Sequence, residues 1–143
     1  MIKQLFIILL LSSCIFAANN GIQNRELPQS EMKSQNEHIA KLAASELSKT
    51  LPQQIDKFTK LIDIKADKAT IIYIYEINIA PKSDATVKSE DHTRMKEAVT
   101  LGTCRSSRRF LEADILIRYI YTSATTQAQL FKFDVNQQSC FQL

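Results

Sequence analysis

The hydrophobic pattern follows a helical period through SEMKSQNEHIAKLAASELSKT, residues 30–50. Apolar side chains recur there every three or four positions, which predicts one stripe on an amphipathic helix. The stripe consists of Ile39, Leu42, Ala43 and Leu47. Ser30 can cap the start of this helix near Glu31. The helix is expected to end before Leu51-Pro52, because the residue before a proline avoids helical geometry.

The period then changes to two, which is typical of strands. Residues 59–67 (TKLIDIKAD) alternate between apolar and polar, and residues 69–79 (ATIIYIYEINI) are mostly β-branched or aromatic. Asp67-Lys68 can form the turn between them, so the two segments predict a hairpin. The second strand is apolar on both faces, and we expect it to be central and covered on both sides, by a helix or a partner.

The second half of the chain repeats this order. Residues 80–91 (APKSDATVKSED) are expected to be a connection, with Ser89 capping a second helix. That helix would carry Met95, Ala98, Val99 and Gly102 on one stripe. Residues 105–113 (RSSRRFLEA) follow Cys104 and suggest a short further helical turn capped by Ser106 or Ser107.

A second hairpin is predicted from DILIRYIYTS (114–123) and AQLFKFDV (128–135). The order helix, hairpin, helix, hairpin predicts an α+β fold: a four-stranded, largely antiparallel sheet in α-β-β-α-β-β order, with the helices on one face.

The first residues have a different pattern, with Lys3 before an apolar run from Leu5 to Leu11. The run is too short to span a membrane, and it leads into small residues, as in a secretory signal. Leu11-Ser12-Ser13-Cys14 resembles a lipobox, in which the cysteine is lipidated. Cleavage after Ala17 or Ala18 is the favoured alternative, because the lipobox would place Ile15-Phe16 directly after the lipid. We expect a signal peptide (1–17), a flexible lead-in (18–29) and a single α+β domain (30–143).

Export affects the cysteines. Processing removes or lipidates Cys14, which leaves Cys104 and Cys140 as an even pair in an oxidising compartment. We therefore expect a Cys104–Cys140 disulfide, since two cysteines without a nearby histidine make a poor zinc site.

The charge of the mature chain is small. Without Lys3, 17 basic and 15 acidic side chains remain, a net charge of +2, which gives no argument for nucleic-acid binding.

Several segments together resemble a widespread group of small exported bacterial proteins. The resemblance covers roughly residues 50–140 and rests on LPQQIDKFTKLIDI, TIIYIYEI, IRYIYTS and a cysteine at each end of the second half. The chain departs from the group at CRSSRRFLEAD (104–114), where Pro and Gly are common. The group has no agreed activity, so the resemblance implies export and a fold but brings no catalytic residues.

Two sets of side chains are candidates for binding. Arg105, Arg108 and Arg109 form the one dense basic cluster and would suit an anion, unless they are only a solvated face paired with Glu112 and Asp114. The pairs Tyr73/Tyr75 and Tyr119/Tyr121 are either core or, on an uncovered face, interface aromatics.

No catalytic motif, metal site or cofactor site is apparent in the sequence. Glu90, Asp91 and His92 are read as acidic and polar residues at a helix start rather than as metal ligands.

We interpret the chain as a non-catalytic exported binding or accessory protein of the bacterial cell envelope. It would be periplasmic or secreted, with another envelope or secreted protein as its partner, and it would touch a membrane only if Cys14 is lipidated. The alternatives are a periplasmic immunity or inhibitor protein, a pilotin-like outer-membrane lipoprotein of a secretion system, or a host-directed secreted factor. The sequence leaves the oligomeric state open.

Overall fold

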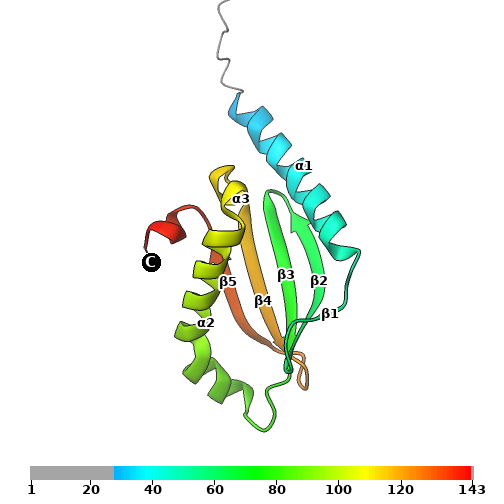
Figure 1. Cartoon of the computed structure of the whole chain (residues 1–143), viewed down its shortest axis with the longest axis vertical. Coiled ribbons are helices and arrows are strands. Elements are labelled where there is room, and N and C mark those ends of the chain that lie inside the picture. Colours follow the sequence, from blue (N-terminus) through cyan, green and yellow to red (C-terminus); the bar gives the residue numbers. More distant parts are fainter. Residues whose placement is uncertain (1–27, 143) are drawn as a thin grey trace, which may run out of the picture.

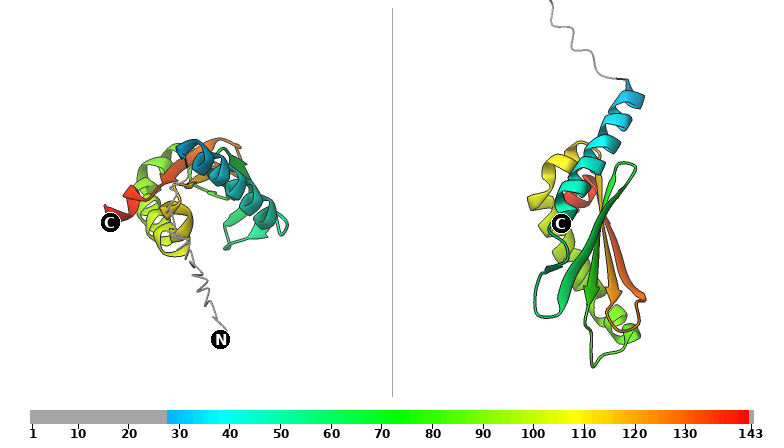
Figure 2. Two further views of the ribbon diagram at one scale, coloured as in Figure 1. Left: turned by 90° about the horizontal axis from the view of Figure 1, so that it is seen from above. Right: turned by 90° about the vertical axis from the view of Figure 1, so that its right-hand side faces the viewer.

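The computed structural model describes residues 28–142, which form a sheet with helices on one of its faces (Figures 1 and 2). The predicted signal peptide, most of the predicted lead-in and Cys14 lie outside the described residues. The elements, in chain order, are α1 (Gln29–Ser48), β1 (Gln53–Gln54), β2 (Thr59–Asp67), β3 (Thr70–Ile77), α2 (Asp84–Ser106), α3 (Arg108–Glu112), β4 (Leu116–Ser123), β5 (Gln129–Val135) and the 3-10 turn η1 (Gln138–Phe141).

The sheet has five strands in the order β1-β2-β3-β4-β5. Both predicted hairpins are present, since β2 pairs with β3 and β4 pairs with β5 in antiparallel fashion. The prediction of a four-stranded, largely antiparallel sheet is confirmed in part: most strand pairs are antiparallel, but two details differ. β1 adds a two-residue edge strand, and the central pair, β3 and β4, is parallel. The pair is parallel because α2 carries the chain back along the sheet between the two strands, as in a β-α-β crossover.

Helix α1 occupies the predicted region and packs on β2 and β3. Its buried side chains, Ala40 and Ala44, are small, so the helix can lie close to the sheet. Leu42 was placed on the buried stripe and is instead 53 % exposed. The cap prediction is also wrong, because the cap position is Pro28 and no side chain caps this helix.

Helix α2 begins earlier than the sequence pattern predicts. Ser83 is its N-cap, and the Ser83 hydroxyl accepts a hydrogen bond from the Thr86 N–H at 3.2 Å. Ser89, the predicted cap, lies inside the helix and donates to the Thr86 carbonyl. Residues 84–91 of the expected connection therefore form the first two turns of α2. On the predicted stripe, Met95 and Val99 are half-buried, whereas Ala98 and Gly102 are exposed.

The core lies between the sheet and the helices, in two neighbouring clusters. One gathers under α1 and α3 around Ile64, Ile71 and Ile117, and the other under α2 around Tyr121, Phe131 and Phe133.

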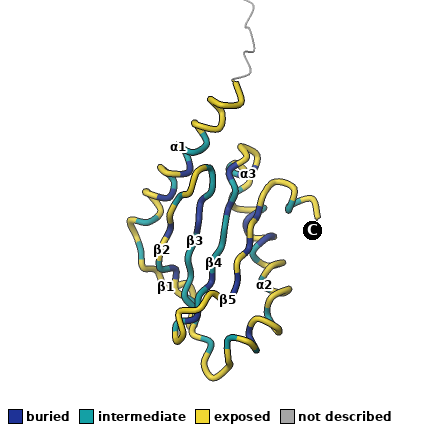
Figure 3. The backbone as a smooth tube through the Cα atoms, turned by 180° about the vertical axis from the view of Figure 1, so that it is seen from behind, coloured by how far each residue is buried: buried dark blue, intermediate teal, exposed yellow. Residues whose placement is uncertain are grey.

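The opposite face of the sheet carries no helix among residues 28–142 (Figure 3). The expectation that a helix covers this side of β3 is therefore wrong for the described residues, and cover by a partner stays a prediction. Ile72 on that face is nevertheless only 6 % exposed. Lys65 and Arg118 flank it in register on the neighbouring strands, where their aliphatic stems can cover it.

Candidate binding surfaces

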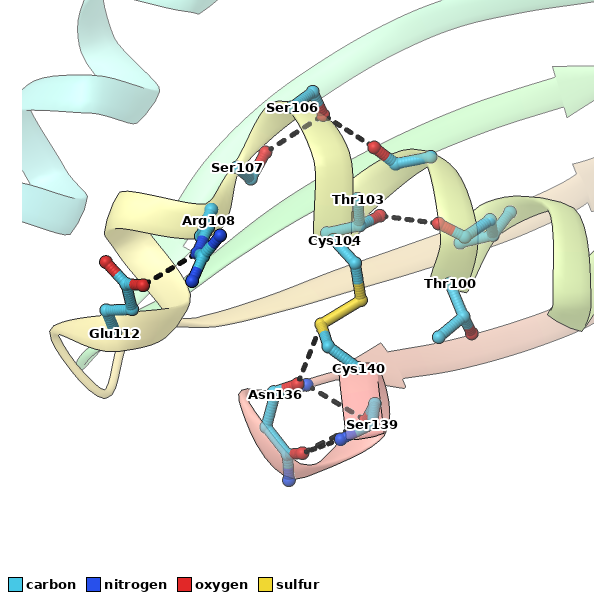
Figure 4. The surroundings of a disulfide bond; sticks show 12 residues. Thr100, Thr103, Cys104, Ser106, Ser107, Arg108, Glu112, Asn136, Ser139 and Cys140 are labelled. Carbon is cyan, nitrogen blue, oxygen red and sulfur yellow. Dashed lines mark hydrogen bonds and ion pairs between the residues drawn. A yellow bond between two sulfur atoms is a disulfide. The ribbon is translucent and has the colours of Figure 1, made fainter. Parts of the chain in front are cut away.

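A disulfide joins Cys104, near the end of α2, to Cys140 in η1, with their Cα atoms 5.6 Å apart (Figure 4). The tail around it is further ordered by Asn136, whose side-chain oxygen accepts a hydrogen bond from the Ser139 N–H at 2.9 Å. The bond thus fixes the tail beyond β5 against the C-terminal half of α2, beside the junction with α3.

The four tyrosines form one stacked strip on the helix-bearing face. The parallel register of β3 and β4 sets Tyr73 beside Tyr119 and Tyr75 beside Tyr121. Their ring centroids are 5.4 Å and 4.9 Å apart, and both pairs are stacked. We call these four residues the tyrosine strip. Because side chains alternate along a strand, the i, i+2 spacing already required each pair to share a face.

The strip lies on the core side but is not fully enclosed. Tyr121 is buried, whereas the other three rings are half-buried. Helix α1 packs on β2 and β3, and α2 packs on β5, so neither helix covers the centre of the sheet completely. The rings lie on the helix-bearing face and pack against the core, as the core reading of the sequence requires, although three of them are only half-buried.

The hydrogen bonds of the tyrosine hydroxyls indicate which of these groups are open to solvent. The Thr103 and Tyr119 hydroxyls share a hydrogen bond of 2.8 Å. The Tyr73 and Tyr75 hydroxyls form no side-chain hydrogen bond among the described residues. In the same residues, every fully buried side-chain polar atom has a hydrogen-bond partner. The Tyr73 and Tyr75 hydroxyls must therefore reach solvent. Burial of the ring still raises the pKa of Tyr75 to about 12, and burial also raises the pKa of Tyr73 and Tyr119.

The three arginines of the basic cluster line a single cleft of about 520 Å³ at the junction of α2 and α3. Ser106, Ser107, Phe110 and Glu112 line it with them. Arg108 donates to Glu112 at 2.7 Å, as the predicted pairing with Glu112 or Asp114 allowed (Figure 4). Arg105 and Arg109 are exposed and form no ion pair within residues 28–142. We call this feature the arginine cleft.

Glu90, Asp91 and His92 each contact a different side chain and do not converge on one point. Glu90 pairs with Lys82, and Asp91 pairs with Arg94. His92 packs its ring against Phe133, with centroids 5.4 Å apart. The described part of the chain contains no group of three His, Cys, Asp or Glu side chains that could hold a metal ion.

Two contacts were not predicted from the sequence. Asn36 of α1 donates to the Ala113 carbonyl at 2.6 Å and so connects α1 to the end of α3. Arg118 and Asp134 form a two-bond ion pair on the helix-free face, at 2.6 and 2.8 Å. The Arg118 hydrogen bond lowers the pKa of Asp134. The sequence does show opposite charges on two strands that were predicted to pair. Whether Arg118 and Asp134 meet depends on the strand register, which the sequence does not give.

Comparison with known proteins gives structural neighbours only. No protein-family model matches the chain, and no curated protein matches its sequence. The EpsS pilotin of the Vibrio vulnificus type 2 secretion system superposes with a TM-score of 0.64 at 17 % identity, over 78 % of this chain and 96 % of that one. The pilotin AspS of the Vibrio cholerae type II secretion system gives a TM-score of 0.57 at 19 % identity, over 78 % and 97 % of the two chains. The chain shares its fold with two type II secretion pilotins.

A third neighbour is a Pseudomonas aeruginosa protein thought to be secreted. It gives a TM-score of 0.68 at 14 % identity and covers 76 % of this chain and 96 % of its own. These identities carry the fold alone. One neighbour is named as a secreted protein and the other two as secretion-system pilotins. None of the helices in residues 28–142 is long and apolar enough to cross a membrane.

Proposed function

We propose that this chain is a pilotin-like accessory protein of the bacterial envelope, which binds another protein of a type II secretion system. The observation that carries the proposal is the coverage of the comparison. The chain matches almost the full length of both pilotins, 96 % and 97 %, so the shared unit is the whole fold and not a common fragment. The pilotin-like alternative from the sequence is therefore the better-supported form of the accessory role.

The tyrosine strip is the proposed contact surface for that partner. Tyrosine rings give a large contact area at a low cost in side-chain entropy, and their hydroxyls can also hydrogen-bond. The rings of Tyr73 and Tyr75 are held by stacking on β4, and their hydroxyls face solvent. A partner segment with apolar side chains and free hydrogen-bonding groups would meet a surface that is already ordered.

This role also concerns the N-terminus. A pilotin-like lipoprotein requires the lipobox to be used, so the proposal favours lipidation of Cys14 over cleavage after Ala17. The intact mass of the protein from its native host distinguishes the two. Lipidation adds a diacylglyceryl group to Cys14, whereas ordinary cleavage gives an unmodified chain that starts at Ala18 or close by.

The proposal is tested by deleting the gene in a host that has a type II secretion system. We expect proteins exported by that system to accumulate in the periplasm, and the wild-type gene to restore their release. Cross-linked envelope should yield a component of the same system bound to the tagged chain. Normal release by the deletion strain would refute the pilotin-like role.

Two adjacent positions of β3 provide a matched pair of variants. Tyr73→Gln changes the helix-bearing face, whereas Ile74→Gln changes the helix-free face, and both residues are half-buried. We expect Tyr73→Gln to lose the captured partner and Ile74→Gln to retain it, after a thermal melt has shown that each variant is folded. The reverse result would place the partner on the other face of the sheet.

A further inference from the structure

The arginine cleft differs from the other charged surface of the molecule in its balance of charge. Its lining contains three arginines and one acidic side chain, Glu112, which is already paired with Arg108. Near α2, Lys82 and Arg94 each pair with a single acidic partner, Glu90 and Asp91. Lys88 and Lys96 are exposed but lie about two helical turns apart. The cleft therefore has an excess of two positive charges, from Arg105 and Arg109.

The backbone under these arginines is held from three sides. Cys104, which precedes Arg105, is joined to Cys140 by the disulfide. Leu111 of α3 is buried in the core. Asn36 of α1 donates to the Ala113 carbonyl just beyond α3. A fixed backbone lowers the entropy lost when the arginines bind an anion.

The side chains themselves are open to solvent. The side chain of Arg108 is 79 % exposed despite its ion pair, and Arg105 and Arg109 are also exposed. An enclosed cage would suit one small ion, whereas exposed guanidinium groups around an open cleft can meet several phosphate groups on a flat surface.

The position of the cleft in the fold indicates that this phosphate-bearing surface is a membrane. Helix α3 lies at the end of the molecule where α1 begins, and α1 extends past the sheet at that end (Figures 1 and 2). The chain enters α1 from the segment that contains Cys14. Residues 15–27 can span at most about 45 Å when fully extended. A lipid on Cys14 would therefore keep this end of the fold within reach of the membrane.

We propose that the arginine cleft binds the phosphodiester headgroups of anionic phospholipids and so turns the α3 end of the fold toward the membrane. Arg105 and Arg109 supply the free charges, and Arg108 contributes the guanidinium nitrogens that Glu112 leaves free. The tyrosine strip stays available to a protein partner. The orientation toward the membrane rests on lipidation of Cys14, which the proposed function requires, whereas headgroup binding by the cleft can be measured without the lipid.

The test uses the purified chain from Ala18, which carries no lipid, and sedimentation with vesicles. One vesicle contains phosphatidylcholine with 30 mol % phosphatidylglycerol, and the other contains phosphatidylcholine alone. Each basic side chain near an anionic surface strengthens binding about fivefold. Arg105→Gln with Arg109→Gln should therefore weaken binding to the anionic vesicle about 25-fold at 0.1 M salt, with little change in melting temperature.

The matched control removes the same amount of charge from α2, away from the cleft. Lys88→Gln with Lys96→Gln changes two exposed lysines, and the nearer one lies nine residues from Arg105, about 13 Å along the helix. That separation exceeds the Debye length of about 10 Å at 0.1 M salt, so this variant should bind anionic vesicles nearly as well as the wild type.

Three results would overturn the proposal. Equal binding by the two double variants would show that only net charge matters. Saturable competition by millimolar inorganic phosphate at constant ionic strength would show a discrete phosphate site instead of a membrane surface. Loss of the captured protein partner in the arginine variant, with vesicle binding unchanged, would assign the cleft to a protein contact. The vesicle assay contains no partner protein, so its failure is separate from failure of the proposed function.

Discussion

Removal of the disulfide should cost the protein much of its stability without changing its fold. The perturbation is the double substitution Cys104→Ser and Cys140→Ser in the chain from Ala18. The two cysteines are 36 positions apart in sequence. In the chain-entropy model a closed loop of that size restricts the unfolded state by about 4 kcal/mol at 25 °C.

The native contacts indicate that this loss arises mainly in the unfolded chain. Both cysteines are only half-buried, and they pack against the edge of the core cluster under α1 and α3 without belonging to its buried residues. The contacts of η1 are mainly with α2 and β5, whereas the rest of the sheet and α1 pack without it, so the double variant should keep its secondary structure. The local exception is η1 itself, which the disulfide ties to α2.

The assay is urea unfolding followed by circular dichroism, with the oxidised wild type as reference and the reduced wild type as a second form without the bond. Both forms without the bond should lose about 4 kcal/mol in free energy of unfolding. Amide hydrogen exchange should show lost protection in η1 and retained protection in β4 and β5 relative to global unfolding. A loss below about 1 kcal/mol, or a melted sheet at zero urea, would refute this reasoning.

Two further predictions concern a helix cap and the tyrosine strip. Ser83→Ala should cost about 1 kcal/mol in free energy of unfolding, because it removes the cap of α2. Ser89→Ala, inside the helix, should cost only a few tenths of a kcal/mol. Equal losses in urea titrations would contradict the observed start of α2. Burial raises the pKa of Tyr75 to about 12, above the value near 10 of an unfolded tyrosine, so its contribution to stability is complete below about pH 10 and is lost as the pH rises toward 12. Alkaline titration should therefore show tyrosinate absorbance at 295 nm rising together with loss of the circular dichroism signal, and titration of all four tyrosines near pH 10 in a folded protein would contradict the burial.

The local elements could be predicted because each carries its own period. The alternation of residues 59–67 and the aromatic strands at 70–77 and 116–123 indicate their faces without knowledge of their neighbours. The parallel pairing of β3 and β4 could not be predicted in this way. It depends on where α2 crosses the sheet, and an α-β-β-α-β-β order is compatible with several strand orders. β1 has only two residues, too few for any periodic signal.

The start of α2 shows how local signals can compete. Ser83 and Ser89 are each followed by acidic and helix-forming residues, and either could serve as a cap. The structure selects Ser83 because Val87 is then buried in the cluster under α2, beside Phe131 and Phe133. A cap alone does not decide a helix start; the apolar contact of its first turns does.

For the candidate binding surfaces, too, the sequence predicts which residues cluster, and the tertiary fold decides how they are arranged. The arginines are neighbours in sequence, so their clustering followed from the sequence, but their shared cleft required the bend between α2 and α3. The tyrosine pairs shared a face by their spacing. That they form one strip depends on the register of β3 and β4, and their half-buried state depends on how far apart α1 and α2 pack.

The central claim is that a protein partner binds the helix-bearing face at the tyrosine strip. The most direct measurement is site-specific photo-crosslinking in the native envelope, with a photoreactive residue placed at Tyr75 or, as control for the opposite face, at Ile74. The account predicts a covalent adduct from position 75 with a component of the secretion system and none from position 74. An adduct from position 74 alone, or none from position 75 in a variant that still restores secretion to the deletion strain, would contradict it.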